Sequence, residues 1–244
     1  MIEVKNLSCG YDRTVISHAD FCIGTHLCIL GANGVGKSTL AKALCGLIGH
    51  KGEILIDGKP LAAYTAEQRA KTITYIPPKL ASFDPFIRVD EFVLMGRYPH
   101  KEPYRDYSRR DRSLVETLLA EIDLDPSRQI GELSSGQQQL LLIAQAFVQE
   151  SRIIIFDEPT ANLDPRRTRE FYQALATLDG ATQKIIITHD LNLAKKLGFA
   201  ILFLSEESSE LFSDPKRFFT AENLKRCYGV EFELHHSHVE VKYD

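Results

Sequence analysis

The 244-residue sequence has little of what marks secreted and membrane-spanning chains. Its five cysteines are odd in number and include no C-x-x-C pair, so they indicate neither a disulfide framework nor a zinc site. A reducing compartment fits best. No apolar run approaches the ~20 residues of a membrane-spanning helix, and the segment Met1–Lys5 lacks the basic and apolar regions of a secretion signal. Work at a membrane would therefore need a partner that holds the chain there.

An excess of positive charge is also missing. The net charge is −4, whereas sequence-independent binding of nucleic acid depends on clustered Lys and Arg. Short basic groups at residues 109–112 and 166–169 fall in predicted helices among acidic residues, which is typical of solvated helix faces. With 44% hydrophobic and 25% charged residues the composition is that of an ordinary globular protein. Nucleic acid is not an expected partner.

A phosphate-binding loop is the feature around which the chain is organised. The apolar run Leu27–Leu30 predicts a strand, and apolar residues after Ser38 recur at helical spacing. Between them the sequence fits the pattern G-x-x-x-x-G-K-[ST]. The residues predicted to bind the nucleotide are Gly31, Asn33, Gly34, Gly36, Lys37, Ser38 and Thr39.

Each residue type in this loop has a physical role. Glycines let the backbone curl so that its N–H groups point at a phosphate, and the following helix directs its positive dipole end at the same anion. Lys37 supplies a charge for the β- and γ-phosphates, and Ser38 offers a hydroxyl to Mg²⁺. The alternative is a flexible glycine turn, which the flanking strand and helix disfavour.

Two carboxylates follow a second apolar run. Ile153–Phe156 predicts a strand that delivers Asp157 to the carboxyl edge of a parallel sheet, where such folds bind ligands. There Asp157 can hold Mg²⁺ through water, and Glu158 can accept a proton from the water that attacks the γ-phosphate. Alone, the pair could equally end a strand in a turn. The phosphate loop favours the functional interpretation.

A third motif, Leu133–Gln137, places small polar residues and a glycine at a helix start. Its form predicts a capping box that begins at Ser135. A second helix start suited to an anion is superfluous in one phosphate-loop site. It makes sense if it faces the phosphate held by another copy of the chain.

The periodicity predicts an α/β fold in one domain. An N-terminal edge strand over residues 2–7 and a mixed β region surround the loop, and a helical lobe over residues 79–150 interrupts the core of residues 1–78 and 151–244. Further strands are predicted at 21–23, 26–30, 52–58, 72–76, 152–156, 184–188 and 200–204. Helices are predicted at 65–70, 89–95, 108–121, 135–149, 165–178, 191–197 and 221–227. The tail alternates over residues 230–241 as an exposed strand would.

These motifs, in this order, resemble the ATP-binding subunits of ABC transporters over essentially the whole chain. Residues 133–137 resemble the LSGGQ signature, with Ser135 in place of its first glycine. Residues 161–164 resemble the D-loop, and residues 187–190 resemble the switch region whose histidine contacts the γ-phosphate. Tyr11 stands where the family has an aromatic that stacks on adenine, although an isolated Tyr is more often a packing residue.

The resemblance implies a P-loop NTPase fold, with a RecA-like parallel-sheet core, an N-terminal antiparallel β subdomain and an inserted helical subdomain. It implies ATP with Mg²⁺, held by Ser38 and Asp157. Two subunits, expected to be identical, pair head to tail, and each ATP lies between one copy's phosphate loop and the other's signature. The implied catalytic residues are Lys37, Glu158 and His189. The implied contacts at the paired surface are Ser134, Ser135, Gly136, Gln137 and Asp164.

One position departs from the family pattern. The family has a glutamine directly after the strand that here ends at Ile76, but this sequence reads Pro77-Pro78-Lys79. Pro78 can neither ligate Mg²⁺ nor hydrogen-bond to water. The hypothesis is that water completes the metal coordination and that hydrolysis is slower.

Residues 90–100 and 219–230 resemble the subgroup that powers uptake of iron-siderophore complexes, haem and vitamin B12. The resemblance implies a peripheral subunit on the cytoplasmic face of the membrane, docked through residues 79–100 on permease subunits that an external binding protein supplies. Two alternatives stay open. A soluble clamp on DNA or ribosomes would need a long coiled-coil insertion or two tandem ATPase domains, together with a basic surface, and the sequence indicates none of these. A regulatory subunit that binds ATP but turns it over slowly is supported by Pro78.

Overall fold

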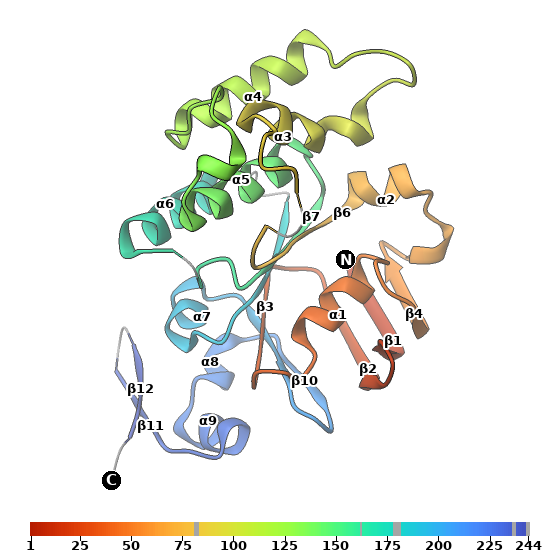
Figure 1. Cartoon of the computed structure of the whole chain (residues 1–244). Coiled ribbons are helices and arrows are strands. Elements are labelled where there is room, and N and C mark those ends of the chain that lie inside the picture. The colour runs from red at the N-terminus through yellow and green to blue at the C-terminus, as the bar shows by residue number, and fades with distance from the viewer. Residues whose placement is uncertain (81–82, 162, 178–181, 236–237, 243–244) are drawn as a thin grey trace. The chain divides into compact units, whose positions relative to one another are not determined.

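Alternating apolar residues build the antiparallel sheet with which the chain begins (Figure 1). The strands β1 (Ile2–Gly10), β2 (Thr14–Ile23), β4 (His50–Ile56) and β5 (Lys59–Pro60) lie in the order β2-β1-β4-β5. β1 therefore has a neighbour on each side, and its prediction as an edge strand is wrong. The reason is that β2 extends back to Thr14, well before the short strand predicted over residues 21–23.

A bulge shifts the alternation within β1. Ile2 and Val4 are buried, but the next buried positions are Leu7 and Cys9. The pairing of β1 with both neighbours shifts register in this interval, where Asn6 adopts a φ of 49°. The extra residue of a bulge moves the following side chains to the other face. Leu7 and Cys9 thereby stay on the buried side.

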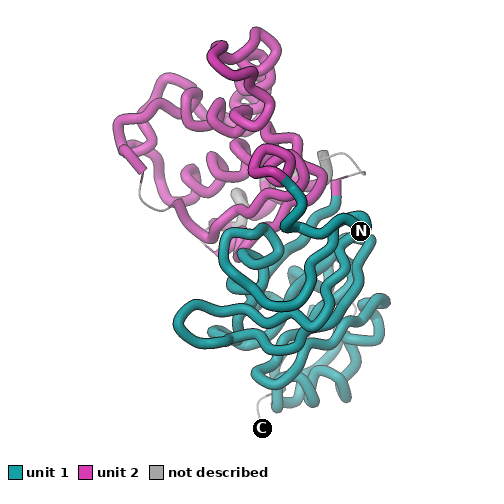
Figure 2. The backbone as a smooth tube through the Cα atoms, turned by 90° about the vertical axis from the view of Figure 1, so that its right-hand side faces the viewer, with its two compact units in different colours: residues 1–64, 183–244 teal, residues 65–182 magenta. Residues whose placement is uncertain are grey.

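The computed structural model describes residues 1–80, 83–161, 163–177, 182–235 and 238–242. The chain forms two compact units, unit 1 from residues 1–64 and 183–244, and unit 2 from residues 65–182 (Figure 2). The helical subdomain expected over residues 79–150 falls within unit 2, and that narrower division stays a prediction.

Three buried parallel strands form the centre of unit 1. β3 (Leu27–Gly31) pairs with β8 (Gln183–Ile187) on one side and with β9 (Ala200–Leu204) on the other, and β10 (Ser209–Phe212) runs antiparallel to β9. Every residue of β3, β8 and β9 is buried, as expected for parallel strands that are covered on both faces. The predicted α/β class is confirmed.

Short helices complete unit 1: η1 (Leu61–Ala63), α1 (Lys37–Leu44), α7 (Leu191–Leu197), α8 (Pro215–Phe218) and α9 (Ala221–Tyr228). β10 and α8, which are only four residues long each, were not predicted from the sequence. Phe218 of α8 is fully buried, with its ring 5.9 Å from Phe203 and 5.2 Å from Phe212. Tertiary packing of aromatic side chains, rather than local periodicity, holds these elements.

Unit 2 combines a parallel strand pair with helices. β6 (Ile73–Ile76) pairs in parallel with β7 (Ile153–Asp157). The helices are α2 (Ala66–Thr72), α3 (Val89–Leu94), η2 (Met95–His100), α4 (Arg109–Glu121), η3 (Ile130–Glu132), α5 (Ser135–Val148) and α6 (Pro165–Thr177). α5 buries residues on all its sides, which makes it the central helix of the unit.

The tail is a hairpin and not the single exposed strand predicted over residues 230–241. β11 (Phe232–Leu234) and β12 (Val239–Val241) pair antiparallel. Both halves alternate, so the period of two could not show where the chain reverses.

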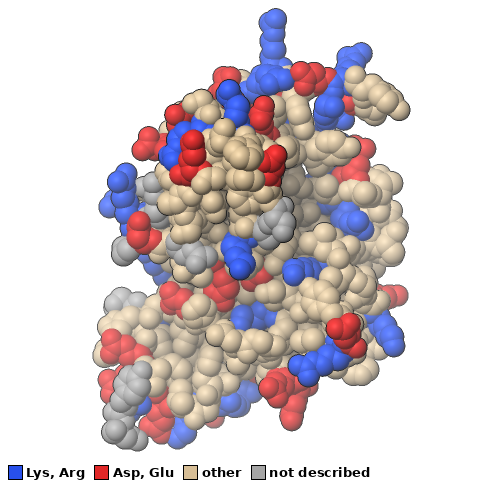
Figure 3. Space-filling model, in the orientation of Figure 1, with Lys and Arg blue, Asp and Glu red and all other residues tan. Residues whose placement is uncertain are grey.

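Charges of both signs are mixed on the surface that Figure 3 shows. On the face drawn in Figure 3, Lys and Arg side chains lie among Asp and Glu. Among the described residues, no helix combines the length and the apolar character needed to cross a membrane.

Candidate nucleotide-binding site

The phosphate loop has the backbone that its sequence predicts. β3 ends at Gly31, α1 begins at Lys37, and the loop between them includes left-handed conformations at Gly34 (φ 83°) and Gly36 (φ 108°). A Cβ on Gly31 would lie 2.3 Å from the carbonyl oxygen of Leu204, and a Cβ on Gly36 would lie 2.8 Å from the Ile16 side chain. Glycine is therefore required at these positions by both conformation and space.

Lys37 lies inside the curve of this loop. Only 7% of the residue is exposed, and its Nζ donates hydrogen bonds of 2.9 Å to the carbonyl oxygens of Gly31 and Ala32. The ammonium is thus held at the concave side of the loop, where an anion would meet it.

The first turn of α1 is suited to an anion as well. Gly36 caps the helix without a side-chain hydrogen bond, and the first turn contains no acidic residue. The N–H groups there have no intrahelical acceptor. Ser38 and Thr39 are half-buried in that turn, while Asn33 and Gly34 are exposed in the loop.

The predicted switch histidine belongs to the same edge of unit 1. β3 and β8 run in parallel, and the N–H of Thr188, just after β8, donates to the carbonyl of Ile29 at 3.2 Å. His189 follows and is exposed, and Asp190 caps α7 by accepting hydrogen bonds from the N–H groups of Asn192 and Leu193. The carboxyl ends of adjacent parallel strands share one sheet edge, so His189 and the phosphate loop lie at the same edge.

Tyr11 is also placed beside α1. The residue is 62% exposed, and its hydroxyl accepts a 3.1 Å hydrogen bond from Nζ of Lys42, a residue of α1. Such exposure leaves the ring face accessible to a flat apolar group. Its role in stacking on adenine stays a prediction.

In unit 2, β7 ends at the predicted acidic pair. Asp157 is 1% exposed, and the hydroxyl of Tyr75 on β6 donates a 2.6 Å hydrogen bond to its Oδ2. Tyr75 was not among the site residues predicted from the sequence. A polar residue on the strand beside β7 could have pointed to it, once the pairing of β6 with β7 was known. Glu158 follows with a φ of 48°, a left-handed conformation that is uncommon outside glycine and tends to cluster at functional sites.

The donor set of these residues fits Mg²⁺. Oδ1 of Asp157 is buried and has no hydrogen-bond partner among the described residues, although a buried carboxylate oxygen normally has one. Tyr75 fixes the other oxygen, so Oδ1 is the atom that a metal-bound water could use. Carboxylate and hydroxyl oxygens are the ligands that Mg²⁺ prefers.

The signature helix starts at Ser135, as predicted, but its capping residue lies one position earlier than predicted. The cap is Ser134, whose hydroxyl accepts from the N–H of Gln137 at 3.3 Å, while the Ser134 N–H donates to Oε1 of Gln137 at 3.0 Å. The capping box predicted to begin at Ser135 is therefore shifted. Ser135 and Gly136 instead occupy the first turn, where backbone N–H groups lack intrahelical acceptors. Ser135 is exposed and Gly136 is half-buried.

The D-loop is partly outside the described residues, because Asn162 is not included. Its other residues follow Glu158 in a series of turns, with the N–H of Ala161 donating to the carbonyl of Glu158 at 3.2 Å. Asp164 is exposed directly before α6.

Residues 79–100, the predicted permease-docking segment, contain two kinds of side chain. Arg97 is buried, and its guanidinium binds Asp111 at 2.7 Å and Glu150 at 2.6 Å. Phe86 and Tyr98 are each 72% exposed. The motif is thus partly structural, and the exposed aromatic residues are the ones available to a partner.

Pro78 is half-buried and is the second residue after β6. A proline has neither a side-chain polar atom nor a backbone N–H, so the Pro78 side chain cannot replace that of the glutamine.

A glycine loop between a buried strand and a helix, with a lysine inside it, defines a P-loop nucleoside triphosphatase. The family described as ABC transporter matches residues 17–161. An uncharacterised ABC transporter ATP-binding protein of Haemophilus influenzae is 34% identical and covers 98% of this chain and 93% of its own length. A hemin import ATP-binding protein of Pseudomonas fluorescens is 34% identical, over 95% of this chain and 93% of that protein.

Among solved structures, one described as an inward-facing conformation of a metal-chelate type ABC transporter superposes with a TM-score of 0.81 at 25% identity, covering 100% of this chain and 98% of that one. The chain belongs to the ABC transporter ATP-binding family. It is an ATPase with the P-loop fold of that family, and the resemblance predicted from its motifs is confirmed.

Proposed function

We propose that this chain is the ATPase subunit of an importer for a metal chelate such as a ferric siderophore, haem or cobalamin. The observation that carries the proposal is the phosphate loop with buried Lys37, in a chain that is 34% identical to a hemin import ATP-binding protein over almost its full length. Similarity to a metal-chelate type transporter supports the same substrate class. Which chelate is carried is decided by the membrane partners.

The nucleotide-binding residues take the following roles in this proposal. The loop from Gly31 to Thr39 and the ammonium of Lys37 bind the phosphates, and Tyr11 stacks on the base. Ser38 and Asp157 hold Mg²⁺, which supplies charge neutralisation for the phosphates. Glu158 accepts the proton of the attacking water.

Closure of the site needs a second copy of the chain. Ser135 and Gly136 lie in the first turn of α5, where backbone N–H groups have no intrahelical acceptor and can bind an anion. We place this turn against the phosphates bound by a sister subunit, with Ser134, Gln137 and Asp164 supporting the contact and His189 on the γ-phosphate. Two subunits would then hold two ATP molecules at their shared surface.

Attachment to the membrane would come from permease subunits on the cytoplasmic side, fed by an external binding protein. The exposed aromatic residues Phe86 and Tyr98 give residues 79–100 a surface that a permease helix could cover. Such a surface would make the ATPase peripheral to the membrane.

The test is ATP hydrolysis by the purified subunit with and without its permease in lipid. We expect the permease to raise the rate, and Glu158→Gln to lower it by roughly 10²- to 10⁴-fold with ATP still bound. A rate that is insensitive to Glu158→Gln would contradict the assignment of the base.

A slow-turnover regulatory subunit is the second candidate, because Pro78 replaces the glutamine expected after β6. Pro78→Gln should raise the ATPase rate of the assembled complex by roughly two- to tenfold, equivalent to about 0.4 to 1.4 kcal/mol of barrier. Pro78→Ala serves as the control because it removes the ring without adding an amide. An unchanged or lower rate with glutamine would count against the proposed role of this position.

A further inference from the structure

One face of the C-terminal hairpin carries two imidazoles and two carboxylates. In the pairing of β11 with β12, Glu233 lies opposite Glu240, and the N–H of His235 donates to the carbonyl of His238 at 3.0 Å, which continues the same register toward the turn. Side chains alternate across a strand, so these four share one face. Phe232, on the opposite face, packs its ring 5.7 Å from that of Tyr228.

This face holds a pair of like charges that opposes the pairing of the two strands. Directly opposite carboxylates destabilise an antiparallel pair, and a two-stranded hairpin is marginal in stability by itself. The hairpin nevertheless places Glu233 and Glu240 opposite each other, with an imidazole two residues from each. A cation between the strands would relieve the repulsion.

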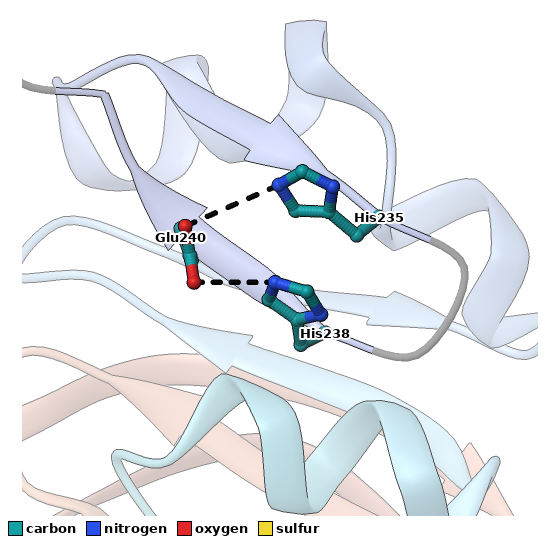
Figure 4. A group of neighbouring side chains, drawn as sticks. All are labelled: His235, His238 and Glu240. Carbon is teal, nitrogen blue, oxygen red and sulfur yellow. Dashed lines mark ion pairs between the residues drawn. The ribbon is translucent and has the colours of Figure 1, made fainter.

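The ligand atoms are close enough for one ion. One ligand atom from each of His235, His238 and Glu240 lies within 4.8 Å of the others (Figure 4). Nε2 of His238 is 3.2 Å from one oxygen of Glu240, and Nε2 of His235 is 4.0 Å from the other. Tetrahedral ligands of zinc are separated by about 3.3 Å, given metal–ligand distances near 2.0–2.1 Å. Small rotations of side chains that are 42–62% exposed would close the gap.

From this geometry we infer that His235, His238 and Glu240 form a binding site for a single divalent transition-metal ion of the Zn²⁺ class. Two of the three ligands are imidazoles, which suit Zn²⁺, Ni²⁺ and Cu²⁺, whereas Mg²⁺ and Ca²⁺ prefer oxygen ligands. The fourth position would be left to water. The site uses none of the nucleotide-binding residues, so it stands or falls independently of the proposed function.

The backbone of the site is held by α7. The Val239 N–H donates to Oδ1 of Asn192 at 2.6 Å, and Nδ2 of Asn192 donates to the Val239 carbonyl at 3.3 Å. Nζ of Lys195 donates to the carbonyls of His235 and His238. These contacts fix the strands before an ion arrives. The nearby ammonium also disfavours a cation, so we expect weaker affinity than at a four-ligand zinc site.

The experiment is a titration of tag-free, nucleotide-free protein with ZnCl₂ in competition with a chromophoric chelator. We expect one Zn²⁺ per chain at this site and at least a tenfold loss of affinity in both His238→Asn and Glu240→Gln. A large excess of Mg²⁺ should not displace the zinc. The matched control is His18→Asn, since His18 is exposed and asparagine tolerates its positive φ of 50°.

Histidine NMR on the unsubstituted protein gives a second measurement that needs no variant. Zn²⁺ should shift the ring resonances of His235 and His238 at one equivalent, while His18 and His50 stay unchanged. The inference is overturned if the chain binds no zinc, if His18→Asn weakens binding as much as His238→Asn, or if the two hairpin imidazoles do not respond.

Discussion

The phosphate loop, residues 31–38, and residues 86–100 of unit 2 each combine a tightly packed glycine with a buried basic residue, but the two basic residues have different roles. Each has a glycine whose added Cβ would lie 2.3 Å from a carbonyl oxygen, that of Leu204 for Gly31 and that of Gln145 for Gly96. Each also has a buried basic residue, Lys37 at 7% and Arg97 at 5% exposure.

The two cations lie in different surroundings. Arg97 binds the carboxylates of Asp111 and Glu150, which balance its charge within the protein. Lys37 donates to backbone carbonyls of its own loop, beside a helix start without acidic residues. A buried cation paired with carboxylates supports the fold, whereas a cation beside helix N–H groups is suited to bind an anion.

The sharpest way to test this difference is to remove Arg97. Arg97→Ala leaves Asp111 buried without its partner, so the free energy of unfolding should fall by about 3–5 kcal/mol. Tyr98→Ala, at the exposed neighbour, should change it by less than about 0.5 kcal/mol while lowering permease-stimulated ATP hydrolysis. Denaturant titration and ATPase assays on both variants would measure this. Equal stability of the two variants would contradict a structural role for Arg97.

The two glycines offer a matched pair. Gly31→Ala should lower the ATPase rate by about 100-fold, which corresponds to an activation free energy higher by about 2.7 kcal/mol. The reason is that the added Cβ would displace the loop from its phosphate-binding conformation. Gly96→Ala should instead destabilise the protein by about 1–3 kcal/mol through overpacking against α5, with ATP affinity unchanged. Calorimetric ATP binding and thermal unfolding distinguish the outcomes. Loss of ATP binding by folded Gly96→Ala protein would contradict a purely structural role for Gly96.

Acid should lower the stability that the ion pairs of Arg97 with Asp111 and Glu150 provide, with a smaller effect than the substitutions above. Burial by itself raises the pKa of Asp111, but hydrogen bonds from Ser108 and Arg97 outweigh it and hold the pKa below its ordinary value of 3.8. A depressed pKa contributes stability at neutral pH that is lost as the pH falls through 3.8 toward the folded-state value. Stability of Asp111→Asn should therefore depend less on pH between about 5 and 3 than that of the unsubstituted protein. If the free energy of unfolding of the two proteins changed with pH in the same way, Asp111 would not contribute to acid sensitivity.

Sequence reasoning succeeded where local chemistry forces the structure. The loop from Gly31 to Ser38 carries its conformational demands in its own glycines, and α7 and β9 have the bounds predicted for them. Predictions were incomplete where contacts between residues far apart in the chain determine the structure. The contact between Tyr75 and Asp157 depends on the pairing of β6 with β7, whose residues are far apart in the chain.

The same limit explains the segment of residues 86–100. A resemblance placed the whole motif at a partner surface, but only the fold shows that Arg97 turns inward to residues 111 and 150. The prediction for the tail was wrong for a further reason. Strand alternation stays the same when the chain reverses, so the sequence pattern could not predict the hairpin or the pairing of its two histidines.

The central claim is that one copy's phosphate loop and another copy's signature close on the same ATP, and sedimentation of Glu158→Gln with ATP tests it most directly. We predict a dimer with ATP and a monomer without it. Adding Ser135→Arg, at an exposed residue of the helix tip, should leave the protein folded and able to bind ATP but monomeric. A dimer that survives Ser135→Arg, or one that forms without nucleotide, would contradict the account.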